Sequence, residues 1–133
     1  MEILTVPAQT EHLEEVLSFA GNLARDAGLE TKEINNVCIA VEEVFVNIAS
    51  YAYTSDDGEV TISVFAESGK LIIEFEDSGT PYDPLAKADP DVTLSAGERE
   101  IGGLGIFMVK ELMDDVVYRY EDGKNVLTIY YLY

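Results

Sequence analysis

Hydrophobic residues recur at helical spacing in the first part of the chain, whereas later segments alternate or cluster as strands do. After a short strand over Glu2–Val6, apolar residues at three- and four-residue intervals predict an amphipathic helix over Gln9–Ala27 that ends near Gly28. These apolar positions are Leu13, Val16, Leu17, Ala20, Leu23 and Ala24. A second helix is predicted from Thr31, whose hydroxyl suits an N-cap, to about Ala52. Its buried stripe should contain Ile34, Val37, Val41, Val44 and Ile48.

The second half of the chain contains two pairs of strand-like runs separated by a helix. VTISVFAE and KLIIEFED flank Ser68-Gly69, a plausible hairpin turn, and VVYRY and NVLTIYYLY flank the turn EDGK. A third helix fits Leu104–Met113. Between the pairs, Thr80–Gly102 loses periodicity and contains three of the four prolines, which is typical of a lid or binding loop. This order predicts an α+β fold: a mostly antiparallel sheet with helices on one face.

Composition limits the function classes. A chain of 133 residues with 47% hydrophobic content fits one domain over residues 1–133. Eight Lys and Arg stand against 26 Asp and Glu, and the net charge of −18 argues against binding to nucleic acid or an anionic membrane. A phosphate site in such a chain must rely on oriented backbone N–H groups or on a divalent cation.

The sequence offers no sign of secretion or membrane insertion. Cys38 is the one cysteine, so an internal disulfide is impossible, and no apolar run reaches membrane-spanning length. We therefore expect a cytoplasmic protein. His12 and Cys38 lack partners at catalytic or metal-ligand spacing and are interpreted as structural.

Two polar residues on the second predicted helix form the first candidate site. Glu43 and Asn47 are four positions apart, so they share a helix face about one turn apart, or ~6 Å along the axis. The carboxylate could orient a water or hydroxyl, and the carboxamide could offer its carbonyl oxygen to Mg²⁺. Spacing alone favours a solvated polar face over a catalytic one.

A second candidate is the strand end at Asp77, which Ser78 and Gly79 follow. A carboxylate there can accept a hydrogen bond from an exocyclic amino group, and Gly79 permits close backbone approach by a ligand. A simple turn would have a similar composition.

The third candidate is the glycine run Gly102-Gly103-Leu104-Gly105 before the third helix. Successive N–H groups at a helix start can form an anion cradle, and the same glycines can serve as a hinge for the preceding loop. The nearest basic residues are Arg99 and Lys110. Arg99 could reach a terminal phosphate from the loop. Lys110 could equally be a solvated residue with no contact to the site.

The three candidates occur in a familiar order. EEVFVNIASYAY, DSGTPYDP and GGLGIFMVKELMDDV resemble the N, G1 and G2 boxes of the GHKL ATPase superfamily, specifically its anti-sigma factor serine kinases. The resemblance covers about residues 31–133. It implies a Bergerat-type two-layer α/β sandwich that holds ATP between the helical layer and a lid.

The resemblance also implies roles for the candidate residues. Asn47 looks like the Mg²⁺ ligand, Glu43 like the general base for a serine hydroxyl, and Asp77 like the adenine-reading carboxylate beside Gly79. Gly103, Leu104 and Gly105 would offer backbone donors to the phosphates. Two positions depart from the family pattern: Tyr51 replaces the usual histidine, and Ile101 stands where some relatives have arginine, with Arg99 two residues earlier.

Partners follow from the resemblance alone. Such kinases form homodimers, phosphorylate a serine of a small anti-sigma factor antagonist, and sequester a sigma factor. Two alternatives stay open: an ATP-binding interaction module that sequesters a regulatory partner without significant catalysis, and a kinase that regulates another signalling complex. Histidine kinases need a phosphoacceptor helix pair, and mismatch-repair and chaperone relatives need further domains, so these readings fit 133 residues poorly.

Overall fold

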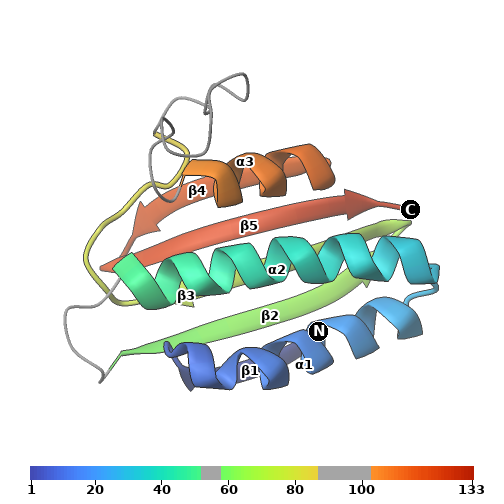
Figure 1. Cartoon of the computed structure of the whole chain (residues 1–133), viewed down its shortest axis with the longest axis horizontal. Coiled ribbons are helices and arrows are strands. Elements are labelled where there is room, and N and C mark those ends of the chain that lie inside the picture. Colours follow the sequence, from blue (N-terminus) through green and yellow to red (C-terminus); the bar gives the residue numbers. More distant parts are fainter. Residues whose placement is uncertain (52–57, 87–102) are drawn as a thin grey trace.

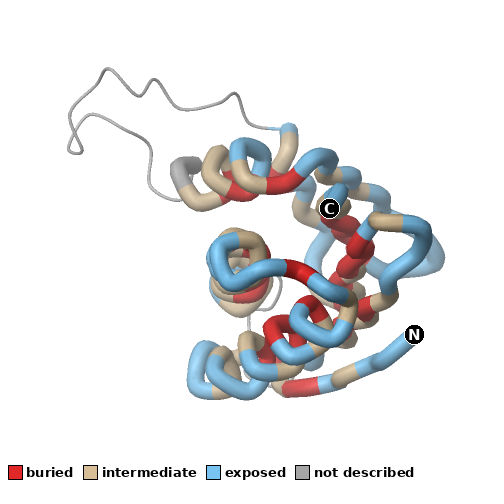
Figure 2. The backbone as a smooth tube through the Cα atoms, turned by 90° about the vertical axis from the view of Figure 1, so that its right-hand side faces the viewer, coloured by how far each residue is buried: buried red, intermediate tan, exposed pale blue. Residues whose placement is uncertain are grey.

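One antiparallel sheet carries the helices on a single face (Figures 1 and 2). The computed structural model describes residues 1–51, 58–86 and 103–133, and within them the sheet has five strands in the order β1-β2-β3-β5-β4. The strands are β1 (Glu2–Pro7), β2 (Glu59–Glu67), β3 (Lys70–Asp77), β4 (Asp115–Glu121) and β5 (Lys124–Leu132). The helices are α1 (Leu13–Asp26), α2 (Thr31–Tyr51) and α3 (Gly103–Leu112), with a 3₁₀ turn, η1, over Thr10–His12. The predicted α+β class is confirmed.

Helix boundaries match the predictions closely, with one error at the start of α2. Thr31 is the first helical residue and not its cap. The N-cap position belongs to Glu30, whose carbonyl accepts a 2.9 Å bond from Ile34 N–H and whose own N–H donates a 3.0 Å bond to Glu33. A glutamate three residues into a helix often bonds back in this way, as in the capping box. The predicted end of α2 at Ala52 lies outside the described residues.

Both hairpins use tight two-residue turns. Ser68 and Gly69 join β2 to β3 with φ of 50° and 79°, and Asp122 and Gly123 join β4 to β5 with φ of 54° and 77°. Two consecutive residues with positive φ give a turn that matches the twist of antiparallel strands. Glycine and aspartate adopt positive φ more readily than most residues, which explains why Gly69, Asp122 and Gly123 occur in these turns. Both hairpin predictions are confirmed, although β4 and β5 extend further into the EDGK segment than expected.

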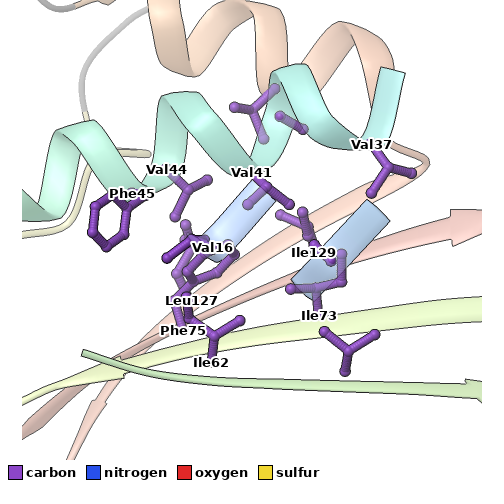
Figure 3. Close-up of a cluster of buried hydrophobic side chains, with 14 of the residues drawn as sticks. Val16, Val37, Val41, Val44, Phe45, Ile62, Ile73, Phe75, Leu127 and Ile129 are labelled. Atoms are coloured by element: carbon purple, nitrogen blue, oxygen red, sulfur yellow. The ribbon is translucent and has the colours of Figure 1, made fainter. Parts of the chain in front are cut away.

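The core lies between α2 and the middle strands (Figure 3). Val37, Val41, Val44 and Phe45 of α2 face side chains from β2, β3 and β5, with Val16 of α1 beside them. The strand residues are Ile62, Ile73, Phe75, Leu127 and Ile129. In the predicted stripe of α2, Ile34 and Ile48 are only half-buried, while Ala40 and Phe45 are fully buried.

The central strand β3 positions the candidate site. Its last residue, Asp77, pairs with Asn125 near the start of β5, so two polar residues meet at one end of the sheet. The predicted lid is described only from Thr80 to Ala86, and its remainder lies outside the described residues. Within the described ranges, the helices are too short or too polar to cross a membrane.

Candidate functional site

Two adjoining pockets lie at this end of the sheet. The first, here called the sheet pocket, has polar side chains Asn47, Asp77 and Asn125 among apolar and tyrosine side chains. Those others are Val44, Ile48, Phe75, Tyr82, Pro84, Ile106, Tyr118 and Leu127. The second, the helix pocket, lies between α2 and α3 and is lined by Glu43, Val46, Asn47, Ser50, Tyr51, Gly105 and Ile106. Asn47 and Ile106 line both, so the two pockets adjoin at these side chains.

Asp77 is a buried carboxylate in the sheet pocket. It is 4% exposed, and its Oδ1 accepts 2.9 Å bonds from Gly79 N–H and from Asn125 Nδ2. Burial raises the pKa of Asp77, and the bonds from Asn125 and Gly79 offset part of that rise. A buried acceptor beside apolar side chains favours a ligand that presents a hydrogen-bond donor on an apolar body.

Asn125 connects three parts of the structure. Its Nδ2 donates to Asp77 Oδ1 and, over 3.0 Å, to the carbonyl of Thr80. Its Oδ1 accepts a 3.1 Å bond from Tyr82 N–H and a further bond from the Tyr118 hydroxyl. These contacts tie the ends of β3 and β5 to the segment that leaves β3.

Glu43 lies against the first turns of α3. A methyl group at Gly105 would overlap Oε2 of Glu43 and stand 3.3 Å from its Cδ, so glycine allows the carboxylate to occupy this position. Burial raises the pKa of Glu43, and the neighbouring Glu42 carboxylate raises it further. A glutamate with a raised pKa is better suited to accept a proton near neutral pH.

Helix α3 begins at Gly103, so Gly103, Leu104 and Gly105 supply its first backbone N–H groups. The first four N–H groups of a helix lack intrahelical acceptors and carry a partial positive charge. Lys110 lies in the last turn, about 10 Å along the axis from Gly103, and is exposed. Arg99 lies outside the described residues.

Among the described residues, neither pocket is lined by lysine or arginine. Arg119 is paired with Glu121 over 2.8 Å and Lys124 with Glu76 over 3.0 Å, and neither lines the site. His12 contacts Glu15, and Cys38 is half-buried near the carbonyl of Leu17; neither residue lines either of the two pockets.

Sequence reasoning missed Asn125, Tyr82 and Tyr118. Tyr82 also stacks on Tyr51, with ring centroids 5.3 Å apart and planes 20° from parallel, so the loop after β3 contacts the end of α2. The available signal was Asn125 itself, a polar residue that opens an apolar strand run. Its role became evident only from the pairing of β3 with β5, which brings Asn125 beside Asp77.

Comparisons with known proteins give a consistent result. The family described as "Histidine kinase-like ATPase domain" matches residues 6–131. The serine-protein kinase RsbW of Listeria monocytogenes serotype 4a is 31% identical, over 97% of this chain and 85% of its own length. RsbW of Bacillus cereus strain B4264 is 28% identical, over 97% and 83%.

Solved structures share the fold. The RsbU and RsbW domains of a Mycobacterium tuberculosis protein superpose with a TM-score of 0.65 at 14% identity, over 99% of this chain and 32% of that one. The catalytic domain of the histidine kinase ThkA gives a TM-score of 0.58 at 13% identity, over 99% and 97%. With the two-layer architecture, the family match and the RsbW relatives in agreement, the chain belongs to the histidine kinase-like ATPase domain family, in its group of RsbW-type serine-protein kinases.

Proposed function

We propose that the chain is an ATP-dependent protein serine kinase that acts as a switchable anti-sigma factor and phosphorylates a serine of an anti-sigma factor antagonist. The observation that carries this proposal is that the two pockets adjoin at Asn47 and Ile106. The buried carboxylate of Asp77 lines the sheet pocket, Glu43 with its raised pKa lines the helix pocket, and Asn47 lines both.

The sheet pocket suits the adenine base. Apolar side chains and two tyrosines offer contacts to a flat ring, and Asp77 offers an acceptor to the exocyclic amino group. Because the Gly79 and Asn125 bonds are both accepted by Oδ1, we assign Oδ2 to the amino group. Gly79 stands beside the base in this assignment.

The phosphates would extend toward the helix pocket and the start of α3. Gly103, Leu104 and Gly105 would donate backbone N–H bonds, and Arg99 would approach the terminal phosphate from the loop. Magnesium, when bound, would offset the phosphate charge and polarise the transferred group. Asn47 would offer such an ion its side-chain carbonyl oxygen, a ligand type that Mg²⁺ accepts. Mg²⁺ commonly takes few protein oxygens together with substrate phosphates.

Glu43 performs the proton transfer in this mechanism. It accepts the proton of the incoming serine hydroxyl while the serine oxygen forms a bond to the γ-phosphorus. The bond from that phosphorus to the β–γ bridging oxygen breaks, and ADP leaves with the electron pair. Gly105 contributes by leaving space for the carboxylate beside α3.

We further propose the partners that the resemblance implies: the antagonist as substrate, a sigma factor as client, and a second copy of the chain in a cytoplasmic homodimer. A net charge of −18 complements a basic protein surface and disfavours direct contact with nucleic acid or an anionic membrane. Co-purification with and without ATP would identify the client and separate this proposal from a kinase of another signalling complex.

Glu43→Gln tests the catalytic assignment. The variant should bind ATP within about threefold of wild type and lose transfer to the antagonist by roughly 10²- to 10⁴-fold, because the amide cannot accept the proton. Glu42→Gln is the matched control, since Glu42 is the neighbouring half-buried glutamate, and it should retain transfer within about threefold. Full transfer by Glu43→Gln would remove Glu43 from this role. ATP binding without any phosphoserine in the wild type would favour the non-catalytic interaction module.

A further inference from the structure

All the hydrogen-bond donors and acceptors of the Asn125 side chain have partners. A carboxamide offers two N–H donors and an oxygen with two lone pairs. In Asn125 the donors reach Asp77 and the Thr80 carbonyl, and the oxygen accepts from Tyr82 N–H and the Tyr118 hydroxyl. With 6% of the residue exposed, these four bonds fix both the position of the amide and its orientation.

We propose that Asn125, held by Tyr118, is a positioning residue that orients the Asp77 carboxylate and thereby sets the preference for adenine over other purines. This inference rests on the proposed function, which makes Asp77 the group that reads the base. Asn125 acts through Asp77 and through the loop, and it is not assigned any contact with the reacting phosphate.

The direction of the Asp77 carboxylate follows from its two bonds. Gly79 N–H and Asn125 Nδ2 both donate to Oδ1 over 2.9 Å. Gly79 follows the end of β3, whereas Asn125 lies near the start of β5. Two donors on one oxygen restrain rotation about the Cβ–Cγ bond, so the direction in which Oδ2 points is fixed before a ligand arrives. A preorganised acceptor discriminates better, because binding does not have to order it.

Asn125 also holds the wall of the pocket. The carbonyl of Thr80 and the N–H of Tyr82 are both bound to it, so the chain segment that leaves β3 is pinned to β5. The ring of Tyr82 then stacks on Tyr51 at the end of α2, one turn beyond Asn47. Loss of Asn125 would therefore loosen the acceptor and the adjacent wall together.

Tyr118 provides a mild perturbation of the same group. Its hydroxyl donates to Asn125 Oδ1 from β4, so Tyr118→Phe removes one of the four bonds and retains the ring that lines the pocket. Tyr120→Phe is the matched control, because Tyr120 lies two residues further along β4 and is 48% exposed. Asn125→Leu is the severe perturbation, with similar size and no polar atoms.

The test compares the dissociation constants of ATP and of purine riboside triphosphate, which lacks the exocyclic amino group, for each full-length variant. A variant that is partly unfolded binds both nucleotides more weakly by the same factor, so their ratio isolates the reading of the amino group. Wild type should prefer ATP by about 10- to 100-fold, as expected for a hydrogen bond to a carboxylate.

Asn125→Leu should reduce the ratio to below about threefold, Tyr118→Phe should reduce it by about threefold, and Tyr120→Phe should leave it unchanged. A wild-type ratio retained in both Asn125→Leu and Tyr118→Phe overturns the positioning role while leaving Asp77 as the reader of adenine. If Asn125→Leu does not fold, Tyr118→Phe alone decides between these results. A wild type that binds both nucleotides equally overturns the adenine assignment of Asp77 and this inference with it.

Discussion

Replacing Gly105 with alanine should separate the stability of the chain from its chemistry. Gly105 lies in α3, where alanine is favoured over glycine by about 0.5–1 kcal/mol because it loses less backbone entropy on folding. The added Cβ would overlap Oε2 of Glu43 and stand 3.3 Å from its Cδ and 3.8 Å from its Cβ. The overlapping atom is the end of a flexible side chain, so the carboxylate can move away and the helix can remain in place.

The displacement sets the size of the catalytic effect. Ordinary contact between carbon and oxygen requires Oε2 to recede by on the order of 1 Å. A misplacement of about 1 Å in a reacting group lowers the rate by roughly 10²-fold. We therefore expect Gly105→Ala to keep or raise the free energy of unfolding, by up to ~1 kcal/mol, and to lower phosphoryl transfer by about 10²-fold.

Urea denaturation gives the stability, and single-turnover transfer to the antagonist gives the rate. Gly21→Ala is the control, because Gly21 is also a helical glycine, but its Cβ would meet Cys38 Sγ at 3.4 Å, an ordinary contact. That variant should gain stability with transfer unchanged. If Gly105→Ala is at least as stable as wild type and transfers phosphate at the wild-type rate, the idea that this glycine positions Glu43 is refuted.

Three further outcomes follow from the site. Since burial and Glu42 raise the pKa of Glu43, transfer should fall on acidification at a higher pH than an ordinary glutamate would give, and Glu42→Gln should move the midpoint of the pH–rate profile downward. Burial also raises the pKa of Asp77, so its ionised form opposes folding above that pKa. Asp77→Asn should therefore raise the free energy of unfolding at pH 7 without nucleotide, and this gain should shrink as the pH falls toward the unfolded-state pKa of about 3.9. The same variant should abolish the preference for ATP. A variant less stable than wild type at pH 7 would contradict the expected direction of the stability change. Arg99→Ala should reduce the preference for ATP over ADP in equilibrium binding, whereas an unchanged preference would leave the backbone N–H groups as the main clamp.

Local features of the fold could be predicted because neighbours in sequence determine them. The apolar spacing of α1 and α2 and the turn residues Ser68-Gly69 each specify a local geometry, and the structure has the elements they predict. The cap at Thr31 was wrong because another local bond, from Glu30 N–H to Glu33, occupies the start of the helix. Glu30 and Thr31 are adjacent, and only the backbone geometry shows which of them is the cap.

The candidate site was predictable in its local parts only. Glu43 and Asn47 are neighbours on one helix face, and Asp77 ends an apolar strand, so sequence patterns mark them. The contact between Asn125 and Asp77 joins residues 48 positions apart, and it depends on the register of β3 against β5. The contact of Gly105 with Glu43 likewise depends on how α3 packs on α2, which periodicity does not specify.

The strand order has a consequence for how the chain assembles. Each hairpin, β2–β3 and β4–β5, forms from residues close in sequence, whereas β3 and β5 join two segments separated by a helix. Closing such non-local pairings carries a loop-entropy penalty that local turns avoid. Asp77 and Asn125 meet across this seam, so a ligand in the sheet pocket binds only chains whose two hairpins have docked. Nucleotide at 100 times its dissociation constant would add about 2.7 kcal/mol to the folded state, and it would do so by holding the two hairpins together where β3 pairs with β5.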